Sequence, residues 1–360
     1  ACDQVGPDSG CDTNPQFNQV SSVHNFLIIK HLSGYYLSMA DLLNKLSIYI
    51  QTLSRKMSAM EDNKTNKRAY LVDSSIYFFW GWLVYPEHMS DIDGNPSNAV
   101  YGFTEFLHEL IQLEQPEYIA CAFDAKQTNS YRREIFPEYK ANRPPAPEEL
   151  KRQFKYCRDF CRAAGIADYS SNRYEADDII GTLATRLRDD GYAITIISAD
   201  KDLAQLIRPG DIWWDFARDK ILHYRDVEKT YGVHPELIAD LLALSGDAVD
   251  NVPGIPGVGY KMASNLLKKY PGVEHVLENI HKISEMKFRG SARIQRLVEE
   301  HQHMLPMTKQ LTTIVTDAEF KGPKQDLRWH GVDENALHKM LDQLNAGPGR
   351  RERWLNLQPV

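Results

Sequence analysis

The chain has 360 residues, of which 42% are hydrophobic and 25% are charged, and its formal net charge is −7. This is the composition of a globular protein with a sizeable core, and no apolar run is long enough for a membrane-spanning helix. The five cysteines, Cys2, Cys11, Cys121, Cys157 and Cys161, have neither the number nor the spacing of a disulfide framework or a zinc site. Cys157 and Cys161 stand at helical spacing among apolar positions, so we expect them to be core thiols in a reducing compartment.

Residues 1–67 differ from the rest of the chain. They are rich in Asn, Ser, Gln and Asp and show little periodicity, apart from a helix expected around Leu37–Leu53. We predict that they form a loosely ordered N-terminal extension.

From residue 68 onward, strands and helices alternate. Short apolar runs predict buried parallel strands at Ala69–Val72, Tyr118–Phe123 and Ala193–Ser198. Amphipathic stretches between them predict helices at Asn98–Leu113, Pro147–Ala164 and Ala176–Arg188. This alternation is typical of an α/β fold with a doubly wound, mainly parallel sheet between helices. A hairpin at the sheet's edge is expected from Asp211–Phe216 and Lys220–Tyr224.

After Tyr224 the pattern becomes helical. Short helices joined by Gly/Pro loops are predicted at Pro235–Leu244, Lys261–Tyr270 and Val273–Ile280. We therefore predict an α/β domain at residues 68–225, a smaller all-helical domain at 226–335 and a C-terminal tail at 336–360.

Acidic residues follow the predicted strands. Asp73 and Asp124 come directly after the first two, and Asp200 and Asp202 come after the third. Because the carboxyl ends of parallel strands line one crevice, we expect these carboxylates to lie together. Taken singly, each is more simply a turn or cap residue.

Two further acidic groups lie outside the strands. Glu175, Asp177 and Asp178 open the helix expected at Ala176–Arg188, and Asp247 and Asp250 lie in a loop. So many acids in one crevice would repel each other unless cations were bound. Oxygen ligands without His or Cys favour Mg²⁺ or Mn²⁺, and two such ions about 4 Å apart suit phosphodiester cleavage.

Five segments occur in the order found in one enzyme family: Val-Asp-Ser-Ser (72–75), Phe-Asp-Ala (123–125), Tyr-Glu-Ala-Asp-Asp (174–178), Ser-Ala-Asp-Lys-Asp (198–202) and Ser-Gly-Asp-Ala-Val-Asp-Asn (245–251). The chain thereby resembles the 5′→3′ exonuclease and flap endonuclease family, which includes the N-terminal domain of bacterial DNA polymerase I, and its length suggests a stand-alone form. The resemblance implies a PIN-like nuclease core with two metal ions. The first would lie among Asp73, Asp124, Glu175, Asp177 and Asp178, and the second among Asp200, Asp202, Asp247 and Asp250.

A basic segment with interleaved aromatic residues precedes the helix at Pro147–Ala164. From Lys126 to Arg162 there are ten Lys or Arg residues against five Asp or Glu. Such a mixture suits single-stranded DNA, although a solvated surface loop has the same composition. By resemblance, residues 126–147 form an arch over a 5′ single strand. Arg132, Lys140 and Arg143 would neutralise the scissile phosphate, with Tyr139 and Arg133 also on the DNA.

The stretch from Val252 to Lys261 places glycines immediately before a helix. Glycine lets backbone N–H groups approach a phosphate, but a tight turn between helices needs glycine too. By resemblance this is a helix-hairpin-helix variant that grips duplex DNA, with a K⁺ ion. Its DNA-binding residues would be Gly257, Gly259, Lys261, Lys268 and Lys269.

We therefore expect a monomeric, metal-dependent 5′→3′ exonuclease or flap endonuclease that acts in primer removal, replication and repair. Its substrates would be DNA flaps, nicks, 5′ ends and RNA primer–DNA hybrids, and its partners a DNA polymerase and a ligase. We expect it in the cytoplasm, at the nucleoid. The alternatives are a catalytically weak protein that binds branched DNA and a PIN-type ribonuclease.

Overall fold

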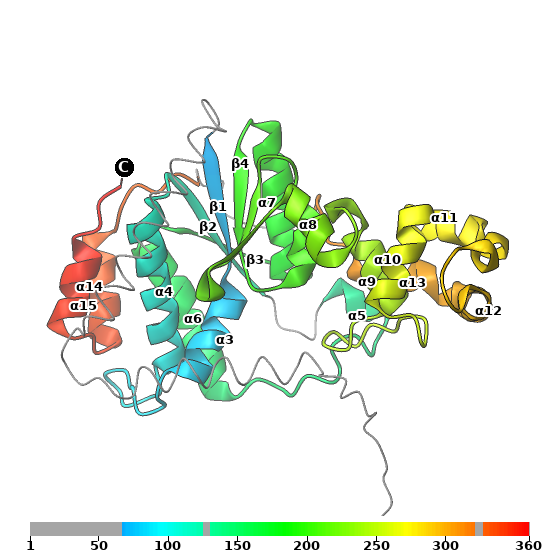
Figure 1. Cartoon of the computed structure of the whole chain (residues 1–360). Coiled ribbons are helices and arrows are strands. Elements are labelled where there is room, and N and C mark those ends of the chain that lie inside the picture. Colours follow the sequence, from blue (N-terminus) through cyan, green and yellow to red (C-terminus); the bar gives the residue numbers. More distant parts are fainter. Residues whose placement is uncertain (1–66, 125–129, 321–326, 360) are drawn as a thin grey trace, which may run out of the picture. The chain divides into compact units, whose positions relative to one another are not determined.

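The computed structural model describes residues 67–124, 130–320 and 327–359. The helix expected at Leu37–Leu53 lies outside these residues, as do residues 125–129 of the arch. The described part contains a six-stranded sheet in the order β3-β2-β1-β4-β5-β6 (Figure 1). The strands are β1 (Arg68–Asp73), β2 (Tyr118–Phe123), β3 (Ala167–Ser170), β4 (Ala193–Ile197), β5 (Ile212–Asp215) and β6 (Lys220–His223).

The strand pairing agrees with the expected α/β sheet. Strands β1 to β5 are paired in parallel, and β6 runs antiparallel to β5 as the edge hairpin. Strand β3 was not predicted, because its short sequence Ala-Asp-Tyr-Ser has a charged residue at its second position. That residue, Asp168, is buried and accepts hydrogen bonds of 2.9 Å from Arg158 and Arg162.

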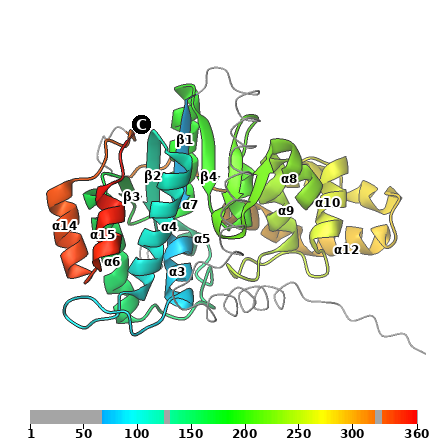
Figure 2. The same ribbon diagram turned by 60° about the vertical axis from the view of Figure 1, so that its left-hand side comes forward.

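Helices cover both faces of the sheet. Alternate residues of β1 point to opposite sides: Ala69 and Leu71 join one apolar cluster, Tyr70 and Val72 the other. The first cluster contains the apolar stripe of α7 (Ala176–Asp189). The second contains residues of α3 (Ser74–Val84), α4 (Asn98–Glu114) and α6 (Glu148–Ala163). The doubly wound arrangement is confirmed (Figure 2).

The second half of the chain is helical, as expected, and shares a core with the sheet. Its α-helices are α8 (Tyr224–Tyr231), α9 (Ile238–Ser245), α10 (Tyr260–Lys269), α11 (Val273–Glu278), α12 (Ser291–His301) and α13 (Leu305–Thr312). Leu241, Leu266 and Val276 of these helices are buried in the same cluster as Ile179 of α7. The change in character near residue 226 is therefore a change of secondary structure within a continuous apolar core.

After α13 the chain returns to the sheet. The backbone N–H of Ala318 donates to Thr182 of α7, and that of Trp329 donates to the carbonyl of Glu117 before β2. Two helices follow, α14 (Glu334–Gln343) and α15 (Pro348–Leu355), beside α4 and α6 in Figure 1.

The expected C-terminal tail at 336–360 is thus mostly helical and partly buried. Leu337 and Leu341, one helical turn apart, and Trp354 enter the second apolar cluster. None of the helices in the described part of the chain combines the length and apolar character that a membrane span needs.

Candidate active site

The acids predicted at the strand ends converge on three neighbouring strands. Asp73 ends β1, whose neighbours in the sheet are β2 and β4, and these two strands lead to Asp124 and Asp200. The Asp73 carboxylate is buried and accepts a 2.9 Å hydrogen bond from Ser198 Oγ. Asp124 accepts a 2.8 Å hydrogen bond from the backbone N–H of Ala176, the first residue of α7. The strand ends and the start of α7 therefore frame one site.

These carboxylates are close enough for the charge of one to raise the pKa of another. Burial, together with the charges of Asp124 and Asp200, raises the pKa of Asp73 to about 7. Burial and the charges of Asp200 and Asp73 also raise the pKa of Asp177. Mutual repulsion of this kind is relieved by protons or by bound cations.

A second set of acids continues from the end of β4. Asp200 accepts a 2.9 Å hydrogen bond from the backbone N–H of Asp202, which lies in the 3-10 turn at Lys201–Leu206. Burial and the charge of Asp200 raise the pKa of Asp202. The Oδ1 atom of Asp202 is buried and has no hydrogen-bond partner among the described residues. Asp247 is paired at 2.8 Å with Lys201, a residue that we did not single out although it stands between two of the acids.

The described residues contain no group of three or more Asp, Glu, His or Cys side chains already arranged as ligands of one metal ion. What they provide is a concentration of hard oxygen ligands from several segments, including a buried oxygen without a partner. This chemistry suits Mg²⁺ or Mn²⁺ better than a softer metal.

The basic segment reaches the acids through Tyr139 and Lys140. The Nζ atom of Lys140 lies 2.7 Å from Glu175 and 3.5 Å from Asp250. The Tyr139 hydroxyl lies 3.2 Å and 3.1 Å from the same two carboxylates, and its ring is buried. Arg143 also pairs with Asp250. These contacts join the two acid sets. We expected Tyr139 to stack on DNA, but its side chain is buried inside the protein.

Glu175 is ionised in this environment. Burial alone would raise its pKa, but the positive charges of Lys140 and Arg132 outweigh burial and lower the pKa to about 2. The carboxylate is thus held as an anion at the start of α7.

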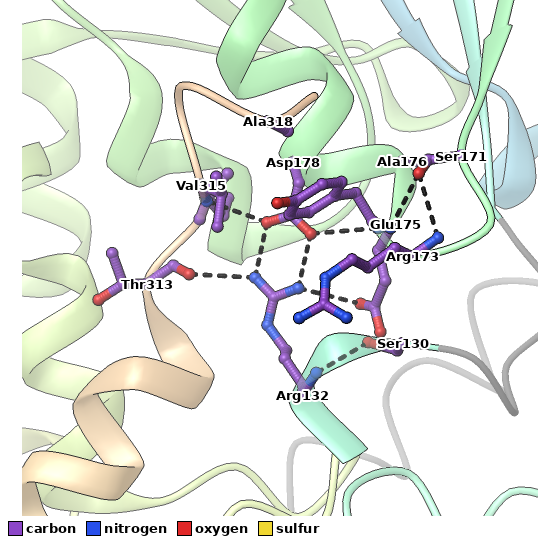
Figure 3. A network of polar contacts seen from close by, with 12 residues as sticks. Ser130, Arg132, Ser171, Arg173, Glu175, Ala176, Asp178, Thr313, Val315 and Ala318 are labelled. Atoms are coloured by element: carbon purple, nitrogen blue, oxygen red, sulfur yellow. Dashed lines mark hydrogen bonds and ion pairs between the residues drawn. The ribbon is translucent and has the colours of Figure 1, made fainter. Parts of the chain in front are cut away.

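Arg132 and Asp178 form a buried ion pair with each other (Figure 3). Their two nitrogen–oxygen distances are 2.7 Å and 2.8 Å, and Asp178 also accepts hydrogen bonds from the backbone N–H groups of Glu175 and Val315. The sequence suggested a metal ligand at Asp178 and a phosphate contact at Arg132. The geometry instead favours a structural pair, because each side chain is 3% exposed or less and engaged on all sides.

Several other basic residues of this region lie on the surface or are paired. Arg133 donates to the carbonyl of Pro137. On α6, Lys155 pairs with Asp159, while Arg158 and Arg162 bind the buried Asp168. These pairs favour a solvated or structural role for α6 over a basic path for DNA.

The predicted glycine loop leads into α10. Gly257 has a φ of +80°, and a β-carbon there would lie 2.9 Å from the guanidinium of Arg293. Gly259 caps α10 with a φ of −88°, and a β-carbon there would meet nothing within 4 Å. Three exposed lysines lie on α10, namely Lys261, Lys268 and Lys269. The loop is thus open to solvent at Gly259, next to exposed positive charge.

Two family models match the chain in succession. The first is described as "5′-3′ exonuclease, N-terminal resolvase-like domain" and matches residues 68–232. The second is described as "5′-3′ exonuclease, C-terminal SAM fold" and matches residues 233–335. The 5′-3′ exonuclease of Aquifex aeolicus (strain VF5) is 36% identical over 278 residues, which cover 77% of this chain and 92% of that protein.

Other relatives are longer, or are similar in fold. The DNA polymerase I of Bacillus caldotenax is 36% identical over 283 residues, but the chain covers only 31% of that protein's length. A solved structure of T5 5′-exonuclease with divalent metal ions (zinc) bound has a TM-score of 0.55 at 20% identity, covering 77% of this chain and 99% of that one. The fold is therefore that of this group of nucleases.

Proposed function

The chain belongs to the 5′-3′ exonuclease family, and we propose that its acid cluster binds divalent metal ions and hydrolyses phosphodiester bonds at or near DNA 5′ ends. The observation that carries this proposal is the convergence of Asp73, Asp124 and Asp200 at the ends of adjacent strands.

The residues present fit a divalent cation. Asp202 Oδ1 is a buried oxygen without a partner among the described residues, and the raised pKa values of Asp73 and Asp177 reflect burial and uncompensated negative charge. When bound, two divalent ions would supply an activated water and neutralise charge on the leaving oxygen. Asp73, Asp124, Glu175 and Asp177 would hold the first ion, and Asp200, Asp202, Asp247 and Asp250 the second. We expect Mg²⁺ in the cell, with Mn²⁺ as a substitute.

The positively charged side chains of Lys140 and Arg143 would orient the phosphate. Lys140 and Arg143 lie against Asp250, and Lys140 also contacts Glu175. A phosphate brought to the carboxylates would therefore meet two positive charges, which stabilise the extra negative charge of the transition state.

The helical part would hold the duplex. The open loop at Gly259 and the exposed lysines of α10 offer backbone N–H groups and positive charge to phosphates, with a K⁺ ion at the loop. A monomer with these two elements would act on flaps, nicks, 5′ ends and primer hybrids, in the cytoplasm at the nucleoid and alongside a DNA polymerase and a ligase.

The test uses end-labelled 5′-flap, nicked, duplex and single-stranded DNA, and an RNA single strand, each with and without Mg²⁺. The proposal expects Mg²⁺-dependent release of short 5′ products from flapped and nicked DNA. Binding without cleavage would favour a branched-DNA-binding protein, and preferential cleavage of the RNA strand would favour a PIN-type ribonuclease.

A further inference from the structure

Residues 311–315, the end of α13 and the residues that follow it, contact Arg132 of the basic segment and the start of α7. The guanidinium of Arg132 donates to the carbonyl oxygens of Leu311 and Thr313, at 2.9 Å and 3.0 Å. The backbone N–H of Val315 donates to Asp178 at 2.9 Å. Because Arg132 and Asp178 also bind each other, one ion pair closes a ring through this segment (Figure 3).

The alternate backbone groups of the same segment bind Gln205. Its side-chain amide donates to the carbonyl of Thr312 at 3.1 Å and accepts from the N–H of Ile314 at 2.9 Å. The amide nitrogen also donates to the carbonyl of Asp202 at 3.0 Å. Gln205 is buried, so each of these polar contacts replaces one that water would otherwise make.

Through Asp178 and Gln205, the segment thereby links the two acid sets. On one side, Asp178 follows Asp177 directly and binds the backbone N–H of Glu175 at 3.1 Å. On the other side, Gln205 holds the backbone of Asp202. A shift of residues 311–315 would move both sets, and catalytic groups lose efficiency when displaced by as little as about 1 Å.

The Arg132–Asp178 pair is built for orientation. Both side chains are buried, and a forked guanidinium against a carboxylate fixes direction as well as distance. A lone ammonium at the same place could not hold the carboxylate and two carbonyl groups in the same plane.

We propose that Arg132 and Gln205 are positioning residues, which hold the two acid sets at a fixed separation by binding alternate backbone groups of residues 311–315. This inference rests on the proposed nuclease function. It assigns Arg132 no contact with the phosphate, and it makes the point where the chain leaves the duplex-holding helices part of the active-site framework.

The test compares Gln205→Met, Arg132→Lys and Arg132→Gln with the native chain. Gln205→Met keeps the side chain's length but removes its three hydrogen bonds, so the single-turnover rate on a flap at saturating Mg²⁺ should fall by about tenfold or more. Flap binding should change less than about twofold, since Gln205 is buried. Arg132→Lys should be as slow as Arg132→Gln, because the charge without the fork does not restore the position.

A second readout needs no cleavage. Calorimetric titration with Ca²⁺, a hard oxygen-binding cation, should show weaker binding in Gln205→Met and in both Arg132 variants. Arg173→Gln is the matched control, because Arg173 forms a bidentate ion pair with Glu134 in the same region but is about half exposed. It should bind Ca²⁺ and cleave as the native chain does.

Several results would overturn the proposal. Native cleavage in Arg132→Lys would mean that charge, not the fork, is what matters. A native cleavage rate together with native Ca²⁺ binding in Gln205→Met would mean that Gln205 is not a positioning residue. If thermal melting shows that the Arg132 variants do not fold, Gln205→Met alone decides. If the native chain cleaves none of the substrates, the proposed function fails, and the Ca²⁺ titrations still report whether the acid sets are held in place.

Discussion

Lys140 and Glu175 form an ion pair of 2.7 Å that joins the basic segment to the start of α7. The backbone of Lys140 has a φ of +53°, which is uncommon for a residue other than glycine. Its N–H donates to the carbonyl of Asp250. Both the backbone and the side chain of Lys140 are thus fixed against acidic residues. Such placement indicates that its charge serves the acid cluster directly.

Replacing both Lys140 and Arg143 with Ala should slow cleavage far more than it weakens DNA binding. Two positive charges close to the carboxylates would be lost, and the loss of one preorganised charge stabiliser typically costs about 10²- to 10³-fold in rate. Single-turnover cleavage and duplex binding by fluorescence anisotropy would measure the two effects. Lys155→Ala is the control, because Lys155 pairs with Asp159 on the surface of α6. Parallel losses in rate and affinity would argue for a purely binding role.

Asp124→Ala should reduce turnover by orders of magnitude while the protein stays folded. Asp124 follows β2 and accepts a hydrogen bond from Ala176, so the change removes one carboxylate and one contact worth about 1 kcal/mol. Thermal unfolding would test the fold, and cleavage at saturating Mg²⁺ the chemistry. Near-native turnover in a folded Asp124→Ala variant would rule out Asp124 as a metal ligand.

The pKa of Asp73 makes the stability of the metal-free protein depend on pH. The group ionises near its ordinary value of 3.8 when unfolded but near 7 when folded, because of burial and the charges of Asp124 and Asp200. Between these values the folded state binds more protons, so stability falls as the pH rises through this range and stays low above it. Glu175, whose pKa is lowered from 4.5 to about 2 on folding, contributes in the opposite sense, and its contribution is complete above about pH 4.5.

A divalent ion favours ionised carboxylates, so Mg²⁺ should raise the melting temperature more at about pH 8 than at about pH 5. Asp73→Asn, which cannot ionise, should weaken the dependence of the metal-free protein on pH, while the raised pKa values of Asp177 and Asp202 leave part of it in place. An equal Mg²⁺ effect at both pH values in the native chain would show that the ion binds elsewhere.

The sequence alone predicted the positions of the acids well, because a polar residue directly after a buried strand has little freedom in where it points. Asp73 and Asp124 lie where the strand pattern put them. The structural role of Asp178 was not predictable from its spacing. Glu175 and Asp178 are three residues apart and both contact Arg132, at 3.8 Å and 2.7 Å, but Asp178 alone forms the bidentate pair with it. Its partners at residues 311–315 come from a return of the chain that no local pattern indicates.

The C-terminal helices illustrate the same limit. Trp354 is 1% exposed, and its ring lies 4.7 Å from that of Phe160 on α6 and 5.5 Å from that of His108 on α4. The amphipathic pattern of α15 does not show which helices it packs against, because α4 and α6 are far from it in the sequence.

Trp354→Ala should therefore destabilise the protein by about 3–5 kcal/mol, as large-to-small changes of buried aromatic residues do. Urea unfolding would measure the loss. Leu83→Ala is the matched control, because Leu83 is a large apolar residue that is 78% exposed, and its loss should change stability by less than about 0.5 kcal/mol. A cost below about 1 kcal/mol for Trp354→Ala would mean that α15 adds little to the core.

Gly259→Val separates the grip on duplex DNA from cleavage. The φ of Gly259 is −88° and a β-carbon there meets nothing within 4 Å, so valine fits the free protein, at a capping cost of about 1 kcal/mol. Gly254 differs, because a β-carbon there would lie 2.2 Å from the backbone nitrogen of Gly246. If a phosphate or K⁺ approaches the backbone at Gly259, a branched side chain blocks it.

Gly259→Val should therefore weaken the binding of duplex and flap DNA by about tenfold or more while sparing the slow cutting of short single strands. Gly347→Val is a close control, because Gly347 also caps a helix, α15, with a negative φ of −67° and open space around its α-carbon. Anisotropy with duplex and single-stranded DNA would compare the two variants. Equal losses on both substrates in Gly259→Val, or equal losses in the two variants, would mean that the glycine loop is a turn between helices and that the duplex is held elsewhere.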